Sequence, residues 1–367
     1  MKTDSSSDDH NFGNLIAQWR EIEQAGEPLD HERGMAWLAS ALRAAVKLEF
    51  STIPPYLCAL WSIKDQASQA ASSIRHIVQE EMLHMSLACN MLVALGEEYS
   101  PGISDPDFAP SYPGELAGGV HKGLQVKLEG FSDNSLRTFL AIELPEMVID
   151  HAVSKLVEAE KYAPAPSGDV TIGELYDLVD EVFGLLQPEL HLYRQVTGPL
   201  VWFPITTLDD VHKAISLITD QGEGSSKSPL EYQPSPGQPL ELSHFYRFLE
   251  LKENKKIIYL EDEDKWGFGE DLERPDCYPM AAVPPGGYSS PGAGAPQRVV
   301  ELCADFNCRY KLMLHHLNAV WEQGDQGELV HAIEHMFALK EVAQALMSIP
   351  VPTGDGATYG PDFRVDS

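Results

Sequence analysis

Apolar residues recur every three or four positions over several long stretches of this chain, and that spacing predicts amphipathic helices. The expected helices cover about residues 15–24, 31–63, 69–95, 132–162, 171 onward, 209–221, 240–251, 297–322 and 327–347. Stretches rich in Gly, Pro and charged residues separate several of them, although residues 124–128 could form a short extended segment. The pattern therefore predicts an all-α protein.

The lengths of the segments between helices predict how the chain is organised. A short turn at 64–68 should make the two long helices on either side of it antiparallel neighbours. Pro54 and Pro55 interrupt the first of these helices and predict a kink or an end. The expected domain plan is a mobile lead-in at 1–30, a helical bundle at 31–252, a long Pro/Gly-rich connecting segment at 253–298, and a C-terminal helical hairpin and tail at 299–367 packed on the bundle.

Composition and charge narrow the classes of function. The 367 residues are 43% hydrophobic, which is ordinary for a globular protein, and carry a formal net charge of −30. That charge repels phosphate backbones and anionic membrane surfaces, so neither nucleic acid nor membrane is expected as a partner. No apolar run is long enough to span a bilayer, and the polar residues 1–14 do not suggest a secretory signal. With five cysteines, an odd number, a cytoplasmic location without a disulfide framework is expected.

The strongest chemical signal is Glu81 followed by His84, because residues three apart share one face of a helix. Apolar residues surround this pair at helical spacing, so both side chains should point into the interior. Glu49 lies in the apolar stripe of the preceding helix and should face the same point. A buried carboxylate needs a partner, and a metal ion is one such partner. The alternative is an ordinary salt bridge.

Two further helices could complete a metal site of the four-helix type, in which two helices each give one Glu and two each give Glu-x-x-His. Glu143 lies among apolar residues on the third helix, with Glu146 as an alternative. On the fourth, Glu241 and His244 form a second literal Glu-x-x-His. Alternatively, Glu223 pairs with His244 across a polar insertion.

A third Glu-x-x-His occurs near the C-terminus. Glu328 and His331, with His335 one turn later, are interpreted mainly as a polar helix face. His315 and His316 are expected to be structural or exposed.

Several motifs together resemble the ferritin-like domain of the iminophenyl-pyruvate dimer synthase family, whose enzymes act in violacein and related bis-indole pathways. The matching segments are LEFSTIPPYL at 48–57, EEMLH at 80–84, residues 139–143 with 145–146, TIGELY at 171–176, QGEG at 221–224 and SHFYRF at 243–248. The resemblance spans about residues 35–250, implies a ferritin-like bundle, and favours Glu223 over Glu241. The additional large region of that family's enzymes is not part of this sequence.

The expected metal ligands are thus Glu49, Glu81, His84, Glu143, Glu223 and His244. Imidazole and carboxylate ligands suit iron or manganese, and Glu81 could bridge two ions. The predicted function is a metal-dependent oxidoreductase that acts, with dioxygen or peroxide, on a small and amino-acid-derived molecule in specialised metabolism. A non-catalytic iron-binding or structural bundle, a manganese-type peroxide dismutase and a metal-free binding protein are the alternatives. A homo-oligomer is compatible with each.

Overall fold

The computed structural model describes residues 11–25, 29–144, 171–198, 201–223, 229–230, 241–290, 293–352, 354, 356–365. Its principal helices are α1 (Phe12–Gln24), α2 (His31–Ser62), α3 (Gln69–Ala94), α4 (Asp133–Ile142), α6 (Ile172–Leu186), α7 (Leu208–Glu223), α8 (His244–Glu253), α9 (Gln297–Gln323) and α10 (Gln326–Met347). Two short 3-10 helices, Ala117–Gly119 and Glu261–Glu263, and the strands β1 (Lys255–Leu260) and β2 (Lys265–Asp271) complete the elements.

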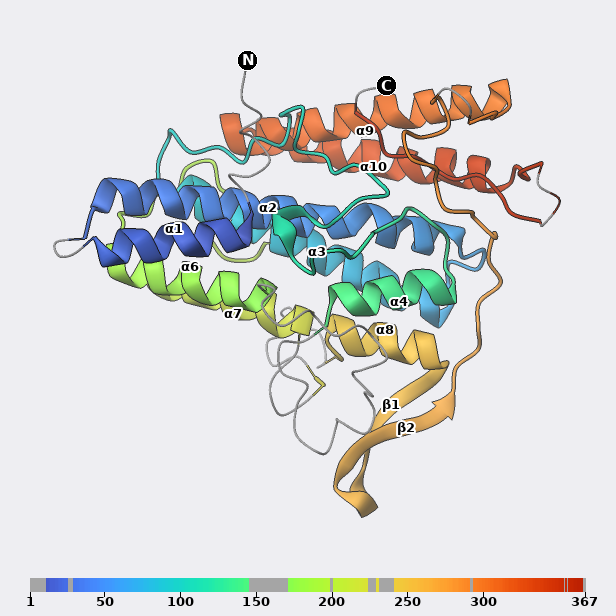
Figure 1. The fold of residues 1–367 in the computed structure, drawn as a ribbon, viewed down its shortest axis with the longest axis horizontal. Coiled ribbons are helices and arrows are strands. Elements are labelled where there is room, and N and C mark those ends of the chain that lie inside the picture. The colour runs from blue at the N-terminus through green and yellow to red at the C-terminus, as the bar shows by residue number, and fades with distance from the viewer. Residues whose placement is uncertain are drawn as a thin grey trace.

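The helices form three layers, and the middle layer is the pair α2 and α3 (Figure 1). On one side, α9 and α10 pack along each other and contact the central pair. On the other side, α6 and α7 pack together, α4 packs on α8, and these helices contact α2 or α3. The helical bundle predicted from the sequence is confirmed. The polar residues converge where α4, α6, α7 and α8 pack against α2 and α3.

Side-chain caps fix where the main helices begin. Asp30 accepts a hydrogen bond from the backbone N–H of Arg33 at the start of α2, and Ser68 does the same for Ala71 at the start of α3. A capping box formed by Thr171 and Glu174 opens α6. In these three cases the N-cap residue fixes where the helix begins.

Pro54 and Pro55 do not end α2, which continues through both prolines to Ser62. Pro55 has no N–H to donate to the carbonyl of Ser51, four residues earlier. The hydroxyl of Tyr112 donates to that carbonyl instead, at 2.6 Å. A hydrogen bond from the crossover segment thus replaces one that the helix cannot make.

Two other helix expectations need correction. α4 ends at Ile142 with Glu143 as its C-cap, rather than continuing as one helix to 162, and the residue before Pro145 disfavours the helical conformation. The remainder, residues 145–170, lies outside the described residues. The helix expected at 240–251 begins only at His244, after the N-cap Ser243.

The segment 253–298 contains a β-hairpin that the hydrophobic pattern did not predict. β1 pairs with β2 in antiparallel register, with Ile258 opposite Gly267 and Tyr259 opposite Trp266. The hairpin follows α8 directly and projects from the bundle (Figure 1). Its β-branched and aromatic residues were a usable signal, but the strands are short and carry many charges. In the described part of the chain, no helix combines the length and apolarity needed to cross a membrane.

Candidate metal centre

Five of the six predicted ligands lie together in the interior, on four different elements. Glu49 comes from α2, and Glu81 and His84 come from adjacent turns of α3. Glu143 caps the C-terminal end of α4, and His244 is the first residue of α8. Each of the five residues is at most 6% exposed. The helical spacing of Glu81 and His84 does place both side chains on one buried face, as expected.

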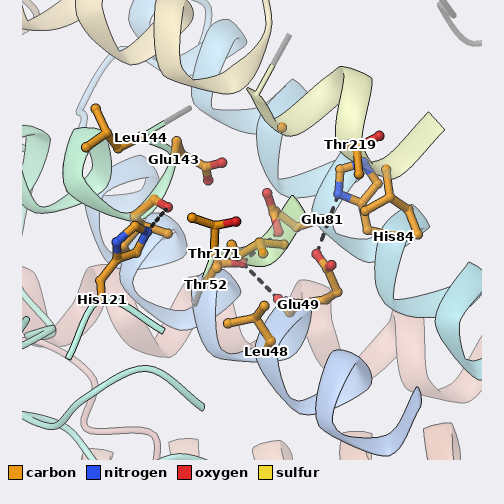
Figure 2. A pocket seen from close by; sticks show the side chains of 14 residues that line it. Leu48, Glu49, Thr52, Glu81, His84, His121, Glu143, Leu144, Thr171 and Thr219 are labelled. Atoms are coloured by element: carbon orange, nitrogen blue, oxygen red, sulfur yellow. Dashed lines mark hydrogen bonds and ion pairs between the residues drawn. The ribbon is translucent and has the colours of Figure 1, made fainter. Parts of the chain in front are cut away.

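The five residues form two groups of three that share Glu81. The Glu49 trio consists of Glu49, Glu81 and His84, and the Glu143 trio consists of Glu81, Glu143 and His244. Within each trio, one potential ligand atom per residue lies within 4.8 Å of the others. Figure 2 shows Glu81 between Glu143 on one side and Glu49 with His84 on the other. Sharing one carboxylate is the arrangement that would let a single side chain touch two ions.

A hydroxyl group holds one oxygen of each carboxylate. Tyr176 donates to Glu49 Oε1 at 2.6 Å, and Tyr56 donates to Glu143 Oε1 at 2.5 Å. Thr52 donates to Glu81 Oε2 at 2.8 Å.

The other oxygen of each carboxylate faces an imidazole. Glu49 Oε2 lies 3.6 Å from His84 Nδ1, and Glu143 Oε2 lies 3.5 Å from His244 Nδ1. Glu81 Oε1 lies 2.8 Å from the same His244 nitrogen. Every carboxylate therefore keeps one oxygen directed at the centre.

The two imidazoles are oriented in the same way. Their rings stack at 5.5 Å between centroids, and both present Nδ1 to the carboxylates. On the outer side, His84 Nε2 lies 2.9 Å from Gln221 Oε1, and His244 Nε2 lies 3.2 Å from Glu80 Oε2. An acceptor at Nε2 favours the tautomer with its hydrogen there, which leaves the lone pair of Nδ1 for a metal ion.

Arg247 forms an ion pair with Glu80, the carboxylate that contacts the outer nitrogen of His244. Its guanidinium contacts both oxygens of Glu80, at 2.6 and 3.2 Å. Although burial alone raises the pKa of Glu80, hydrogen bonds from His244 and the charge of Arg247 lower it to about 2. Glu80 therefore stays ionised and continues to accept from His244 over the whole physiological range.

The carboxylates of the centre repel one another. Burial first, and then the charge of Glu143, raise the pKa of Glu81 from 4.5 to about 7, against the lowering effect of His244. Burial lowers the pKa of His84 and His244, but the adjacent carboxylates more than offset this, so both pKa values are raised. Without a cation, the centre keeps protons that exposed groups of the same kinds would release near neutral pH.

These residues fit a metal ion by their own geometry. His244 Nδ1 is buried and makes no hydrogen bond with any residue that the structure describes, although it lies only 2.8 Å from Glu81 Oε1. The two atoms are therefore close together without forming a hydrogen bond, as two ligands of one ion would be. A cavity of about 30 Å³ lies against Glu49, Glu81, His84 and Glu143. Three carboxylates and two imidazoles are ligands that iron, manganese and zinc accept.

The structure excludes Glu241 from both trios but describes the other two candidate glutamates, Glu223 and Glu146, only in part or not at all. Glu241 is not on the helix of His244 and lies instead 3.5 Å from both His76 and Arg247, so it takes no part in either trio. The backbone of Glu223 ends α7, beside Gly222, where an added Cβ would lie 3.9 Å from Glu143 Oε2. The side chain of Glu223 and the whole of Glu146 lie outside the described residues. Glu223 thus remains a predicted ligand on a helix end that reaches the centre.

The C-terminal histidines belong to α9 and α10, and neither trio includes them. His316 is paired with Glu328, and His331 lies 3.4 Å from Glu334. His315 and His331 are exposed, and His335 is partly buried against the ring of His316. This arrangement agrees with the interpretation of that cluster as a polar helix face.

Sequence reasoning did not single out the residues that hold the ligands. Thr52 and Tyr56 follow Glu49 by three and seven positions, so helical spacing could have placed them on the same face. Tyr176 and Gln221 reach the centre from α6 and α7 across 127 and 137 positions of sequence. Nothing in the local pattern predicts contacts over that distance.

A helical bundle with buried carboxylates and histidines converging from several helices is the hallmark of the ferritin-like class of proteins. A sequence model described as Ferritin-like matches residues 42–253, which is more than half of the chain. This chain belongs to the ferritin-like family. A crystal structure of a ferritin-like protein from Caulobacter vibrioides shares the fold, with a TM-score of 0.57 over 88% of this chain and 96% of that chain at 21% identity.

Two curated relatives carry the resemblance seen in the motifs. The chain is 29% identical over 250 residues to 2-imino-3-(indol-3-yl)propanoate dimerase of Chromobacterium violaceum, covering 59% of this chain and 23% of that protein. It is 23% identical over 321 residues to dichlorochromopyrrolate synthase of Lentzea aerocolonigenes, covering 80% of this chain and 30% of that protein. The chain therefore spans less than a third of the length of either relative.

Proposed function

We propose that this protein is a metal-dependent oxidoreductase that uses a pair of iron or manganese ions to oxidise a small, amino-acid-derived molecule. The single observation that carries the proposal is the convergence of five buried ligand-type residues in two trios that share Glu81. Buried carboxylates are costly unless positive charge lies beside them. Two divalent ions would supply that positive charge.

The residues of the centre have distinct roles in this proposal. Glu49 with His84 would hold one ion, Glu143 with His244 would hold the other, and Glu81 would bridge them. When bound, the ions would supply redox chemistry and open positions for dioxygen or peroxide. Tyr56, Tyr176 and Thr52 fix the carboxylates, while Gln221 and Glu80 fix the imidazoles.

The names of the relatives support the class of substrate. One relative is named for the dimerisation of an indolyl imino acid, and the other for the synthesis of dichlorochromopyrrolate. The family model covers residues 42–253, the region from which the trios come. We therefore propose a place for this protein in specialised metabolism, on a small imino or amino acid substrate.

Metal content and ligand substitution test the centre. The purified protein should hold about two ions of iron or manganese per chain by elemental analysis, before and after removal and anaerobic reloading. Glu49→Gln and Glu143→Gln, one in each trio, should each lower the content toward one ion. Glu241→Gln is the matched control, because Glu241 is a nearby glutamate outside both trios. Full metal content in both ligand variants would contradict the proposed centre.

Turnover separates the functional alternatives. The metal-loaded protein should consume dioxygen or peroxide faster with an indolyl imino acid generated in the assay than without it. Gas evolution from peroxide alone would favour a peroxide dismutase. Bound metal without either activity would favour an iron-binding bundle and contradict the oxidoreductase proposal.

A further inference from the structure

A second group of side chains with metal-ligand chemistry lies where α9 and α10 face each other. The two helices are joined at residues 324–325 and pack along each other (Figure 1). One residue from α9 and three from α10 meet there, and we call them the histidine cluster: His316, Glu328, His331 and His335.

The spacing on α10 puts its three members on one face. Glu328, His331 and His335 are separated by three and four positions, so they project from successive turns of the helix. His316 faces all three from α9. Its ring centroid lies 5.4 Å from that of His331 and 5.3 Å from that of His335, and its Nδ1 contacts the carboxylate of Glu328.

These ring separations are close to those of imidazoles that share one ion. With a metal–nitrogen bond of about 2.0–2.1 Å, two rings bound at a tetrahedral angle have centroids about 5 Å apart. Among the described residues, only the two trios already bring three ligand atoms within 4.8 Å of one another, so the nitrogens of the histidine cluster must turn to converge. Rotation about the Cβ–Cγ bond turns them and leaves the ring centre nearly in place, and this torsion is broad in histidine.

The surroundings of the histidine cluster suit a cation. Burial lowers the pKa of His335, and the neighbouring charge of Arg309 adds to this effect, so the imidazole is neutral and keeps a lone pair for a metal ion. The charge of Arg309 is offset by Asp305, which lies 3.1 Å away. The carboxylates of Glu328 and Glu334 lie next to the imidazoles.

The helix pair that carries the cluster rests incompletely on the rest of the bundle. A cavity of about 370 Å³, lined mostly by apolar residues, is enclosed by α9 and α10 on one side and α2 and α3 on the other. Because the cavity reduces the contacts between the two pairs, the local stability of α9 and α10 depends more on their contacts with each other. An ion bound by both helices would strengthen those contacts.

We propose that the histidine cluster binds one Zn²⁺ ion through its three imidazoles and the carboxylate of Glu328, and thereby clamps α9 to α10. Imidazole and carboxylate groups are ordinary zinc ligands, and four of them complete a tetrahedral site. His331 is exposed, so an ion reaches the cluster from solvent. No member of the cluster belongs to either trio, and the site is therefore separate from the proposed metal centre.

Zinc content, measured as a difference between variants, tests the site on the full chain. In equilibrium dialysis over a series of buffered Zn²⁺ concentrations, the wild type should bind one ion per chain that His316→Gln and His331→Gln bind at least about 10-fold more weakly. Even the loss of an outer partner of a ligand weakens metal binding by roughly 10- to 100-fold. The comparison holds whatever the central site contains. His212→Gln is the matched control, because His212 is an exposed histidine beside the carboxylate of Asp180 and lies outside the cluster.

Hydrogen exchange separates a clamp from an ion held by one helix. Zn²⁺ should slow the exchange of backbone amides in both α9 and α10 of the wild type and of His212→Gln, but not of His331→Gln. His331 is exposed, so its variant serves if His316→Gln fails to fold. Equal zinc affinity in the wild type and His331→Gln, or zinc binding that protects neither or only one of the two helices, would overturn the proposal.

Discussion

Replacing Glu81 by glutamine should make the metal-free protein more stable, although it removes the carboxylate shared by both trios. Glutamine keeps the size of the side chain and an oxygen that can accept from Thr52. It removes a buried negative charge that is repelled by the charges of Glu143 and Glu49. Such a gain would identify a residue retained for binding rather than for folding.

The pKa of Glu81 sets the magnitude and the pH range of this gain. Its folded-state pKa is about 7, above the ordinary value of 4.5. The folded state therefore binds the proton more tightly than the unfolded state, and stability is lost as pH rises from 4.5 to 7. At about 1.4 kcal/mol for each factor of ten in proton affinity, the loss at pH 8 is about 3 kcal/mol. For a chain of this size, a change of that order moves the thermal midpoint by about 5 °C.

Thermal unfolding of chelator-treated protein measures the effect. At pH 8 the midpoint of Glu81→Gln should exceed that of the wild type, and the difference should shrink toward pH 5. With excess Mn²⁺ or anaerobic Fe²⁺ the order should reverse, because only the wild type gains the full binding energy. Glu241→Gln should follow the wild type throughout. The electrostatic reasoning would be refuted if metal-free Glu81→Gln were less stable than the wild type at pH 8. It would also be refuted if the difference in thermal midpoint did not change with pH.

Three further predictions follow from the contacts. Tyr112→Phe should lower the free energy of unfolding by about 1–3 kcal/mol, measured in urea, because it leaves the Ser51 carbonyl without its donor. Metal binding should release protons and become tighter as pH rises, because Glu81, His84 and His244 have raised pKa values. Calorimetry in buffers of different ionisation enthalpy counts the released protons. An affinity that does not depend on pH would contradict this prediction. Gln221→Leu should weaken metal binding by roughly 10- to 100-fold in chelator competition, because His84 loses its outer acceptor, and an unchanged affinity would remove that role.

The sequence predicts those residues of the centre whose positions follow from the geometry of one helix. It predicts far less about residues whose positions depend on contacts between distant segments. Three-residue spacing placed Glu81 and His84 correctly, because a helix fixes which side chains share a face. The same rule failed for Glu241, since α8 begins only after Ser243 and the preceding residues are not helical. The sequence also could not show that α2 continues past Pro54 and Pro55, because the hydroxyl that compensates for the missing hydrogen bond belongs to Tyr112, in another segment. The hydroxyl and amide partners of the ligands depend on how distant helices pack, which no local pattern encodes.

The adjacent residues Glu81 and Met82 on α3 belong to the two different cavities, and so do Glu49 and Phe50 on α2. The two central helices are therefore a partition with ligands on one face and an apolar chamber on the other. A shift or rotation of α3 as a unit would therefore move the carboxylate of Glu81 and the cavity wall at Met82 together. Such a movement would change both compartments at once, although they share no side chain.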